Sequence, residues 1–155
     1  MLSSIAFIFY KNMTTTFQLH PRLKEDCITI GRFDLCQLLM MNDSQYPWFI
    51  LVPEKADIKE IYQLSKSELH TLAEESSYLA ENLASLYHAD KMNVAAIGNL
   101  VPQLHIHHVV RYQADIAWPA PVWGKFAAIP YTAQQITHNI AQVKEQLKML
   151  VECLE

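Results

Sequence analysis

The sequence predicts an α+β fold, in which an antiparallel β-sheet of about five strands has one long helix packed on it and is followed by a C-terminal helix. Three observations predict this fold. Short apolar runs bounded by turn-forming residues indicate strands, and two stripes of apolar residues at spacings of three and four indicate two amphipathic helices. The order of the elements groups the strands in hairpin-like pairs, which favours antiparallel pairing with the helices on one side. We expect one domain over residues 1–155.

Three apolar segments predict the first part of the sheet. Residues 28–33 and 35–41 are short, apolar and close together, and they predict a β-hairpin. Residues 42–47 are rich in turn-forming side chains. Residues 48–52 then predict a buried strand, which Pro53 ends because proline cannot donate a hydrogen bond to a neighbouring strand.

The long helix is predicted to begin after Ser65. A short helix over residues 57–64 is expected before it. Ser65 and Glu68 form a capping box, in which two side chains satisfy backbone N–H groups of the first helical turn. The helical stripe that follows consists of Leu69, Leu72, Ala73, Ser76, Ala80, Leu83 and Tyr87.

Two further strands and a long loop are predicted next. Residues 92–97 predict a fourth strand, and residues 104–111 predict a fifth from their Val and Ile content and alternating polar side chains. Residues 112–131 are rich in proline, so we expect an ordered loop rather than a linker. Within it, Trp118 and Trp123 are expected to be packing anchors.

The two ends of the chain are predicted to differ. Thr132 and Gln135 form a second capping box, which predicts a C-terminal helix over residues 132–155. The apolar stripe of that helix is Ile136, Ile140, Val143, Leu147, Leu150 and Leu154. Residues 1–12 are expected to be an unstructured extension, with Met13 as an alternative start.

Composition and charge exclude several classes of protein. The chain is 51% hydrophobic and 18% charged, which is typical of a folded domain. A net charge of −4 does not indicate the basic surface that binding of a long nucleic acid usually requires. No apolar run is long enough to span a membrane, and we expect no signal peptide. Three widely spaced cysteines, Cys27, Cys36 and Cys153, predict neither disulfides nor a thiolate zinc site and favour a cytoplasmic protein.

Three polar side chains alternate along the predicted fifth strand. Side chains of a strand point to opposite faces in turn, so Gln103, His105 and His107 share one face while His108 lies on the other. One interpretation is a metal site, but the spacing nominates no third ligand from the other histidines, at positions 20, 70, 88 and 138. The other is nucleophilic catalysis, in which an imidazole nitrogen forms a covalent phosphoryl or nucleotidyl intermediate beside polar groups that bind the phosphate.

Residues 98–111 resemble the motif of the histidine triad (HIT) superfamily, in which a glycine and a short polar turn precede alternating histidines and apolar residues. The resemblance covers residues 17–126, including the strand, Asn-bearing turn and strand over residues 35–52. It implies a half-barrel of antiparallel strands, commonly a homodimer, that binds a purine nucleotide with no metal and no other cofactor. Partners are then a small-molecule nucleotide and a second copy of the chain, with no long nucleic acid and no membrane.

The resemblance also implies roles for individual residues. His105 occupies the position of the family's nucleophile, and His107 that of the third histidine, which helps to hold the phosphate. Asn42 matches the position that hydrogen-bonds the ribose. Asn99 matches a polar residue that contacts the phosphate.

Three positions depart from the family pattern. Gln103 stands where the first histidine of the triad is expected, so the orientation of the nucleophile must come from an amide or be lost. Leu100 stands where relatives have a Ser or Thr that assists the leaving group, and the side chain of leucine has no hydrogen-bond donor. His108 replaces an apolar residue, and the sequence gives it no function.

The leading hypothesis is a metal-independent nucleotidyl hydrolase. His105 attacks the α-phosphorus of a dinucleoside polyphosphate, such as diadenosine tetraphosphate, or of a nucleoside phosphoramidate, and water hydrolyses the nucleotidyl-imidazole. Gln103, Asn99 and His107 are expected to steady the phosphate oxygens. The alternative from another class is a catalytically weak nucleotide-binding sensor or scaffold, which the residues at positions 100 and 103 would permit. A third hypothesis is a metal-dependent hydrolase with His105 and His107 as ligands.

Overall fold

The computed structural model describes residues 16–150, and the expected extension over residues 1–12 lies outside them. A short helix that the sequence analysis did not predict, α1, begins the described chain, and five strands and two longer helices follow it. In chain order the elements are α1 (Pro21–Asp26), β1 (Cys27–Arg32), β2 (Cys36–Met41), β3 (Trp48–Pro53), the 3-10 turn η1 (Ile61–Gln63), α2 (Lys66–Tyr87), β4 (Lys91–Ala95), β5 (Ile106–Arg111) and α3 (Ala133–Gln146).

The five strands form one antiparallel sheet in the order β1-β2-β3-β5-β4. This confirms the predicted α+β class, the antiparallel sheet of about five strands and the hairpin of β1 and β2, and the sheet is open, with β1 and β4 at its edges. β5 lies between β3 and β4, and it is buried along its whole length. A strand at this place can present side chains to both faces of the sheet, and those of β5 do so.

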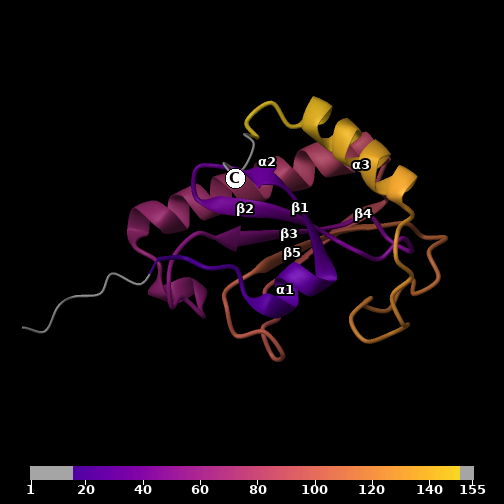
Figure 1. Cartoon of the computed structure of the whole chain (residues 1–155). Coiled ribbons are helices and arrows are strands. Elements are labelled where there is room, and N and C mark those ends of the chain that lie inside the picture. Colours follow the sequence, from indigo (N-terminus) through magenta and orange to yellow (C-terminus); the bar gives the residue numbers. More distant parts are fainter. Residues whose placement is uncertain (1–15, 151–155) are drawn as a thin grey trace, which may run out of the picture.

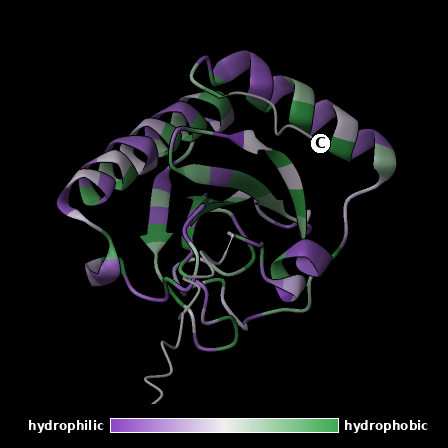
Figure 2. Cartoon of the chain, turned by 60° about the vertical axis from the view of Figure 1, so that its left-hand side comes forward, coloured by the Kyte–Doolittle hydropathy of each residue, from purple (hydrophilic) through white to green (hydrophobic). Residues whose placement is uncertain are grey.

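The long helix α2 begins where the sequence predicts. Ser65 accepts a hydrogen bond from the backbone N–H of Glu68, and the Glu68 side chain accepts one from that of Ser65. The buried face consists of Leu72, Glu75, Leu79 and Leu83. Figure 2 shows hydrophilic and hydrophobic residues alternating along α2 and α3, as amphipathic helices require.

Two apolar clusters lie on the two faces of the sheet. In Figure 1, α2 and α3 cover one face, and α1 lies on the other side of the strands. Leu38, Phe49 and Val110 belong to the cluster that packs against α2 and α3. Ile50 and Val109 belong to the second cluster, which packs against α1 and the loop after β5. Each face of the central strands is therefore covered.

In four predicted elements the structure moves a boundary by more than one residue. The helix expected over residues 57–64 is only the turn η1, because Glu60 has extended backbone angles and the Gln63 side chain accepts the N–H groups of Lys59 and Glu60. The strand expected over 92–97 begins one residue earlier and ends at Ala95, where its pairing with β5 stops.

The other two corrections concern β5 and α3. The fifth strand begins at Ile106 rather than at residue 104, because the N–H of Leu104 donates to the carbonyl of Ile58 and not to a strand. The helix expected over residues 132–155 begins at the predicted cap but ends at Gln146. Leu147 leaves helical geometry and is almost wholly buried in the core, while residues 151–155 lie outside the described part.

The part of the chain over residues 16–150 contains no helix that is both long and apolar enough to cross a membrane.

Candidate active site around His105 and His107

His105 and His107 lie side by side on one face of the sheet. His107 is in β5, and His105 is in the extended segment just before it. Their ring centroids are 4.8 Å apart, with an angle of 74° between the ring planes. Both side chains are about 5% exposed. The alternation predicted from the sequence therefore holds for these two residues, although the strand itself starts later than expected.

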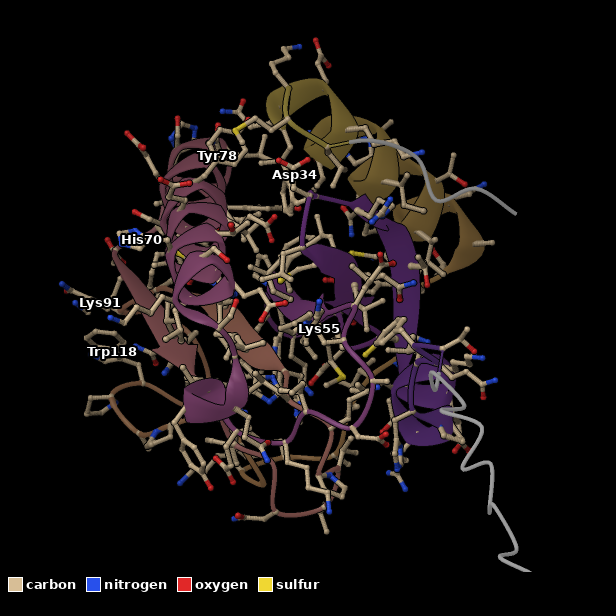
Figure 3. All side chains as sticks on the ribbon, turned by 90° about the vertical axis from the view of Figure 1, so that its left-hand side faces the viewer. Asp34, Lys55, His70, Tyr78, Lys91 and Trp118 are labelled. Carbon is tan, nitrogen blue, oxygen red and sulfur yellow. The ribbon has the colours of Figure 1, made fainter. Side chains whose placement is uncertain are left out.

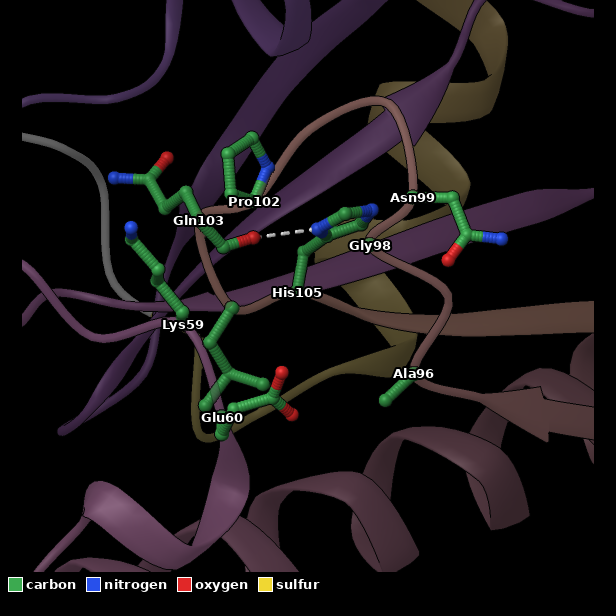
Figure 4. A pocket seen from close by; sticks show the side chains of 9 residues that line it. Lys59, Glu60, Ala96, Gly98, Asn99, Pro102, Gln103 and His105 are labelled. Carbon is green, nitrogen blue, oxygen red and sulfur yellow. Dashed lines mark hydrogen bonds between the residues drawn. The ribbon is translucent and has the colours of Figure 1, made fainter.

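The orientation of His105 is fixed by the main chain. Its Nδ1 lies 2.7 Å from the carbonyl oxygen of Gln103, a contact drawn as a dashed line in Figure 4. Because a carbonyl can only accept, Nδ1 has the proton and Nε2 keeps its lone pair. Burial lowers the pKa of His105, against a raising effect of the Gln103 carbonyl, and His20 lowers it further. The ring is thus held neutral, with an unprotonated nitrogen available for attack.

The Gln103 side chain does something other than expected. Its Oε1 accepts from the backbone N–H of His20 at 2.9 Å, and its Nε2 donates to the carbonyl of Gln18 at 2.8 Å. Figure 4 shows the amide pointing away from the His105 ring. The hydrogen bond that orients His105 is made by the backbone carbonyl of residue 103, and an amino acid of any type at this position has that carbonyl. The Gln103 amide instead holds the segment before α1.

His107 accepts a hydrogen bond from a tryptophan. The indole Nε1 of Trp48, the first residue of β3, lies 3.0 Å from His107 Nδ1. Burial lowers the pKa of His107 to about 3. Nearby His105 and His108 lower this pKa to a smaller extent, and a backbone contact to Ile97 raises it. His107 is therefore a neutral ring near pH 7. The sequence analysis did not find Trp48, because its contact joins residues 59 positions apart.

His108 has a structural partner on the opposite face. Its Nδ1 donates to the Ile106 carbonyl at 3.2 Å, which leaves Nε2 to accept from the Ser76 hydroxyl of α2 at 2.8 Å. Burial lowers the pKa of His108 to about 4. The side chain is completely buried, so it joins the sheet to the long helix and faces away from His105 and His107.

His105 lies at the junction of two cavities. The larger, of about 530 Å³, has mostly apolar walls on the side of α1 and the loop after β5; they include Leu23, Met41, Trp48 and Trp123. Its polar residues include Asn99, His105 and His107, with Arg22 and Asp26 of α1 also lining it. A volume of this size is typical of pockets for small molecules. Trp123, one of the two tryptophans of the loop, is thus a wall of this cavity. Its ring centroid lies 5.5 Å from that of His107.

The smaller cavity, of about 240 Å³, is more polar. Lys59, Glu60, Asn99, Gln103 and His105 line it, together with the turn around Gly98 (Figure 4). His105 and Asn99 line both cavities. A ligand with an apolar ring and a polar chain could therefore extend past the His105 ring from one cavity into the other.

The remaining sequence candidates are placed as follows. Leu100 is 91% exposed and lines the larger cavity without a group that could donate. Asn42 does not line either of these two cavities, and its Oδ1 accepts from the backbone N–H of Tyr131 at 2.9 Å. Its expected contact with a ribose remains a prediction.

The hypothesis of a metal site at His105 and His107 requires a third ligand, and the described residues place none beside these two histidines. Over residues 16–150, no three His, Cys, Asp or Glu side chains lie close enough together to hold a metal ion. His70 is exposed on the outer side of α2, as Figure 3 shows. His20 lies nearer, but its ring Nδ1 accepts from the backbone N–H of Arg22 at 3.1 Å.

The fold and the paired histidines together define a protein of the histidine triad class, and comparisons with known proteins agree. Residues 22–114 match the HIT domain family. A histidine triad protein from Marinobacter aquaeolei is 50% identical, with a TM-score of 0.86 over 88% of this chain and 100% of that one. A histidine triad (HIT) protein from Sinorhizobium meliloti is 42% identical, with a TM-score of 0.84 over 86% of this chain and 99% of that one.

A third structure, a histidine triad protein from Bradyrhizobium japonicum, is 39% identical, with a TM-score of 0.83 over 85% of this chain and 98% of that one. A search of curated proteins gave no match. The chain belongs to the histidine triad (HIT) family.

Proposed function

We propose that this protein is a metal-independent nucleotidyl hydrolase that acts through a covalent intermediate on His105. Membership of the HIT family supports a function of the nucleotide-binding hydrolase or transferase kind. The observation on which the proposal depends is the bond between His105 Nδ1 and the Gln103 carbonyl, which leaves Nε2 unprotonated at the junction of the two cavities. Substrates are a dinucleoside polyphosphate, such as diadenosine tetraphosphate, or a nucleoside phosphoramidate.

The reaction has two displacements at one phosphorus. The Nε2 lone pair of His105 forms a bond to the α-phosphorus while the bond from that phosphorus to the leaving group breaks. The leaving group departs with the bonding electron pair and takes a proton from solvent. The oxygen of a water molecule then forms a bond to the phosphorus and the water releases a proton to solvent, while the nitrogen–phosphorus bond breaks and its electron pair returns to His105 Nε2.

Neighbouring groups stabilise the phosphate oxygens during both steps. The Asn99 amide lines both cavities and is a donor within the same space as the His105 ring. The neutral His107 supplies a ring N–H. Gln103, proposed to stand at the first triad position, contributes its backbone carbonyl to the orientation of His105, while its amide is occupied by residues 18 and 20. No donor at position 100 assists the leaving group.

The larger cavity is the proposed nucleoside site. Its walls include the rings of Trp48 and Trp123 and the side chains of Leu23 and Met41, which suit a flat, largely apolar base. Asn42 Oδ1 accepts from the backbone N–H of Tyr131. To contact a ribose as expected, this oxygen must accept from the ribose hydroxyl as well as from Tyr131, or instead of it.

The assembly is proposed to be a homodimer in the cytoplasm. β4 is an edge strand of the described sheet, and Val94 on it and Ile97 and Leu100 after it are exposed. An edge strand has backbone groups that a second copy can pair with, and exposed apolar side chains favour their burial. Sedimentation analysis is expected to give twice the mass of the chain, and a monomer would overturn this part of the proposal.

Turnover tests the catalytic role directly. His105→Ala is expected to abolish hydrolysis of diadenosine tetraphosphate and of adenosine phosphoramidate, while His70→Ala, the same change at an exposed histidine, keeps wild-type activity. Unaltered activity of His105→Ala would remove the mechanism. Calorimetry of the wild type with adenosine and guanosine monophosphates separates the alternative, because tight binding without any turnover would indicate a sensor or scaffold instead.

A further inference from the structure

Trp48 and His107 are diagonal neighbours on one face of the sheet. In the pairing of β3 with β5, Ile50 lies opposite His107 and Trp48 lies opposite Val109. Side chains two residues apart on a strand share a face, so the indole of Trp48 reaches the ring of His107 along the strand. The indole nitrogen and His107 Nδ1 are 3.0 Å apart, and both side chains are less than a tenth exposed.

The chemistry of this contact leaves one arrangement of protons. An indole N–H can donate and cannot accept, so Nδ1 of His107 must present a lone pair to it. In a neutral imidazole the proton then lies on Nε2. Protonation of Nδ1 would place two N–H groups against each other, and burial away from water also opposes the charged form. The Nε2–H is accordingly the polar group that His107 offers, and His107 lines the larger cavity.

The two adjacent histidines therefore have opposite tautomers. A carbonyl acceptor places the proton of His105 on Nδ1, and an indole donor places the proton of His107 on Nε2. One ring thus has a lone pair at Nε2 and the other has an N–H at Nε2, with ring centroids 4.8 Å apart. A nucleophile and a donor to the phosphoryl oxygen are what the proposed reaction needs on adjacent residues.

We propose that Trp48 is a positioning residue that fixes His107 as a neutral Nε2–H donor, so that the site holds a permanent donor next to the nucleophile. Trp48 acts through His107 and not on the reacting atoms. The consequence for catalysis rests on the proposed function, whereas the tautomer itself does not depend on any substrate.

Nitrogen NMR of the ligand-free protein tests the tautomer first. With ¹⁵N-labelled histidine near pH 7, His107 is expected to show the shift of an unprotonated nitrogen at Nδ1 and of a protonated one at Nε2, and His105 the reverse. A wild-type His107 that has its proton on Nδ1, or that is a mixture of both tautomers, would overturn the proposal without reference to any activity.

Trp48→Phe then tests the cause. This change keeps an aromatic ring and removes the N–H, so His107 is expected to become a mixture of tautomers. Trp123→Phe is the matched control, since Trp123 packs on the same ring and its buried Nε1 has no partner among residues 16–150. The control is judged on the NMR signals alone, and it should leave those of His107 unchanged. An unchanged His107 tautomer in folded Trp48→Phe would contradict the proposal.

The kinetic consequence is a loss in kcat. Losing one fixed hydrogen bond to the transition state is expected to lower kcat of Trp48→Phe by about tenfold, with a much smaller change in KM. If wild-type protein proves to have no hydrolytic activity, the proposed function fails while the NMR result still decides the role of Trp48. If activity is present and kcat of Trp48→Phe is unchanged despite mixed tautomers, the positioning role is wrong.

Discussion

The guanidinium of Arg111 and the carboxylate of Asp115 form a two-point ion pair that is closed off from water. Arg111 Nε and Nη2 lie 2.7 and 3.1 Å from the two carboxylate oxygens. Only 1% of the arginine side chain and 5% of the aspartate side chain are exposed. The same guanidinium donates to Asn93 on β4 and to the Ala120 carbonyl in the loop, so it joins the sheet to the loop that provides Trp123.

Arg111→Met is expected to destabilise the fold by about 3–5 kcal/mol, because it leaves the Asp115 charge buried without its partner. Arg22→Met is the matched control, since Arg22 and Asp26 have the same four-residue spacing but are 60% and 36% exposed. That exposed pair is worth about 0–1 kcal/mol. Urea unfolding of both variants measures the difference, and equal losses would contradict the assigned role of the buried pair.

The Glu75 carboxylate accepts two backbone N–H groups at the turn between β1 and β2. Its oxygens lie 2.7 Å from the N–H nitrogen of Leu35 and 3.1 Å from that of Cys36. Burial raises the pKa of Glu75. Glu75→Ala leaves both donors unsatisfied and should cost about 2–5 kcal/mol, whereas Glu74→Ala at the exposed neighbouring position should cost little. Thermal unfolding that shifts equally in the two variants would show that this contact does not hold the turn.

His108 makes the fold sensitive to acid. Its pKa is about 4 in the folded state against 6.5 ordinarily, so between these values the unfolded chain binds more protons. The stability it contributes is complete above pH 6.5 and is lost as the pH falls towards 4, by on the order of 3 kcal/mol. Glu75, with its raised pKa, acts in the opposite direction, so the variant His108→Asn is needed. The difference in stability between wild type and variant should shrink as the pH falls, and a constant difference would refute the assignment.

The Gln103 side chain is expected to matter for stability and little for catalysis. Gln103→Ala keeps the backbone carbonyl that orients His105 but loses both amide contacts to residues 18 and 20. We expect a loss of about 1–2 kcal/mol in the free energy of unfolding and a change in kcat of less than about threefold. A hundredfold loss of kcat with a modest loss of stability would instead place the amide in the chemistry.

Local patterns predicted much of this molecule. Both capping boxes, at Ser65 and Thr132, depend on neighbouring residues only, and the structure has them where the sequence placed them. Strand alternation likewise predicted that His105 and His107 share a face, with His108 on the other. These features follow from the spacing of residues along the chain, which the sequence shows directly.

What the sequence did not predict depends on contacts between distant segments. The helix α1 is six residues long, too short to show a helical period, and its Leu23 packs against the sheet. Glu75 lies on the buried face of α2 but not in the stripe that the sequence predicts, and only the fold shows that it meets the backbone N–H groups of Leu35 and Cys36. The donor for His107 comes from another strand. Such pairs leave no local signal in one sequence.

The stereochemistry at phosphorus tests the nucleotidyl-histidine mechanism most directly. A substrate with a chiral α-phosphorothioate is hydrolysed in isotopically labelled water, and the configuration of the product nucleotide is determined. Two in-line displacements, first by His105 and then by water, each invert the phosphorus, so the account predicts overall retention. Overall inversion would mean that water attacks the substrate directly, and His105 would not be the nucleophile.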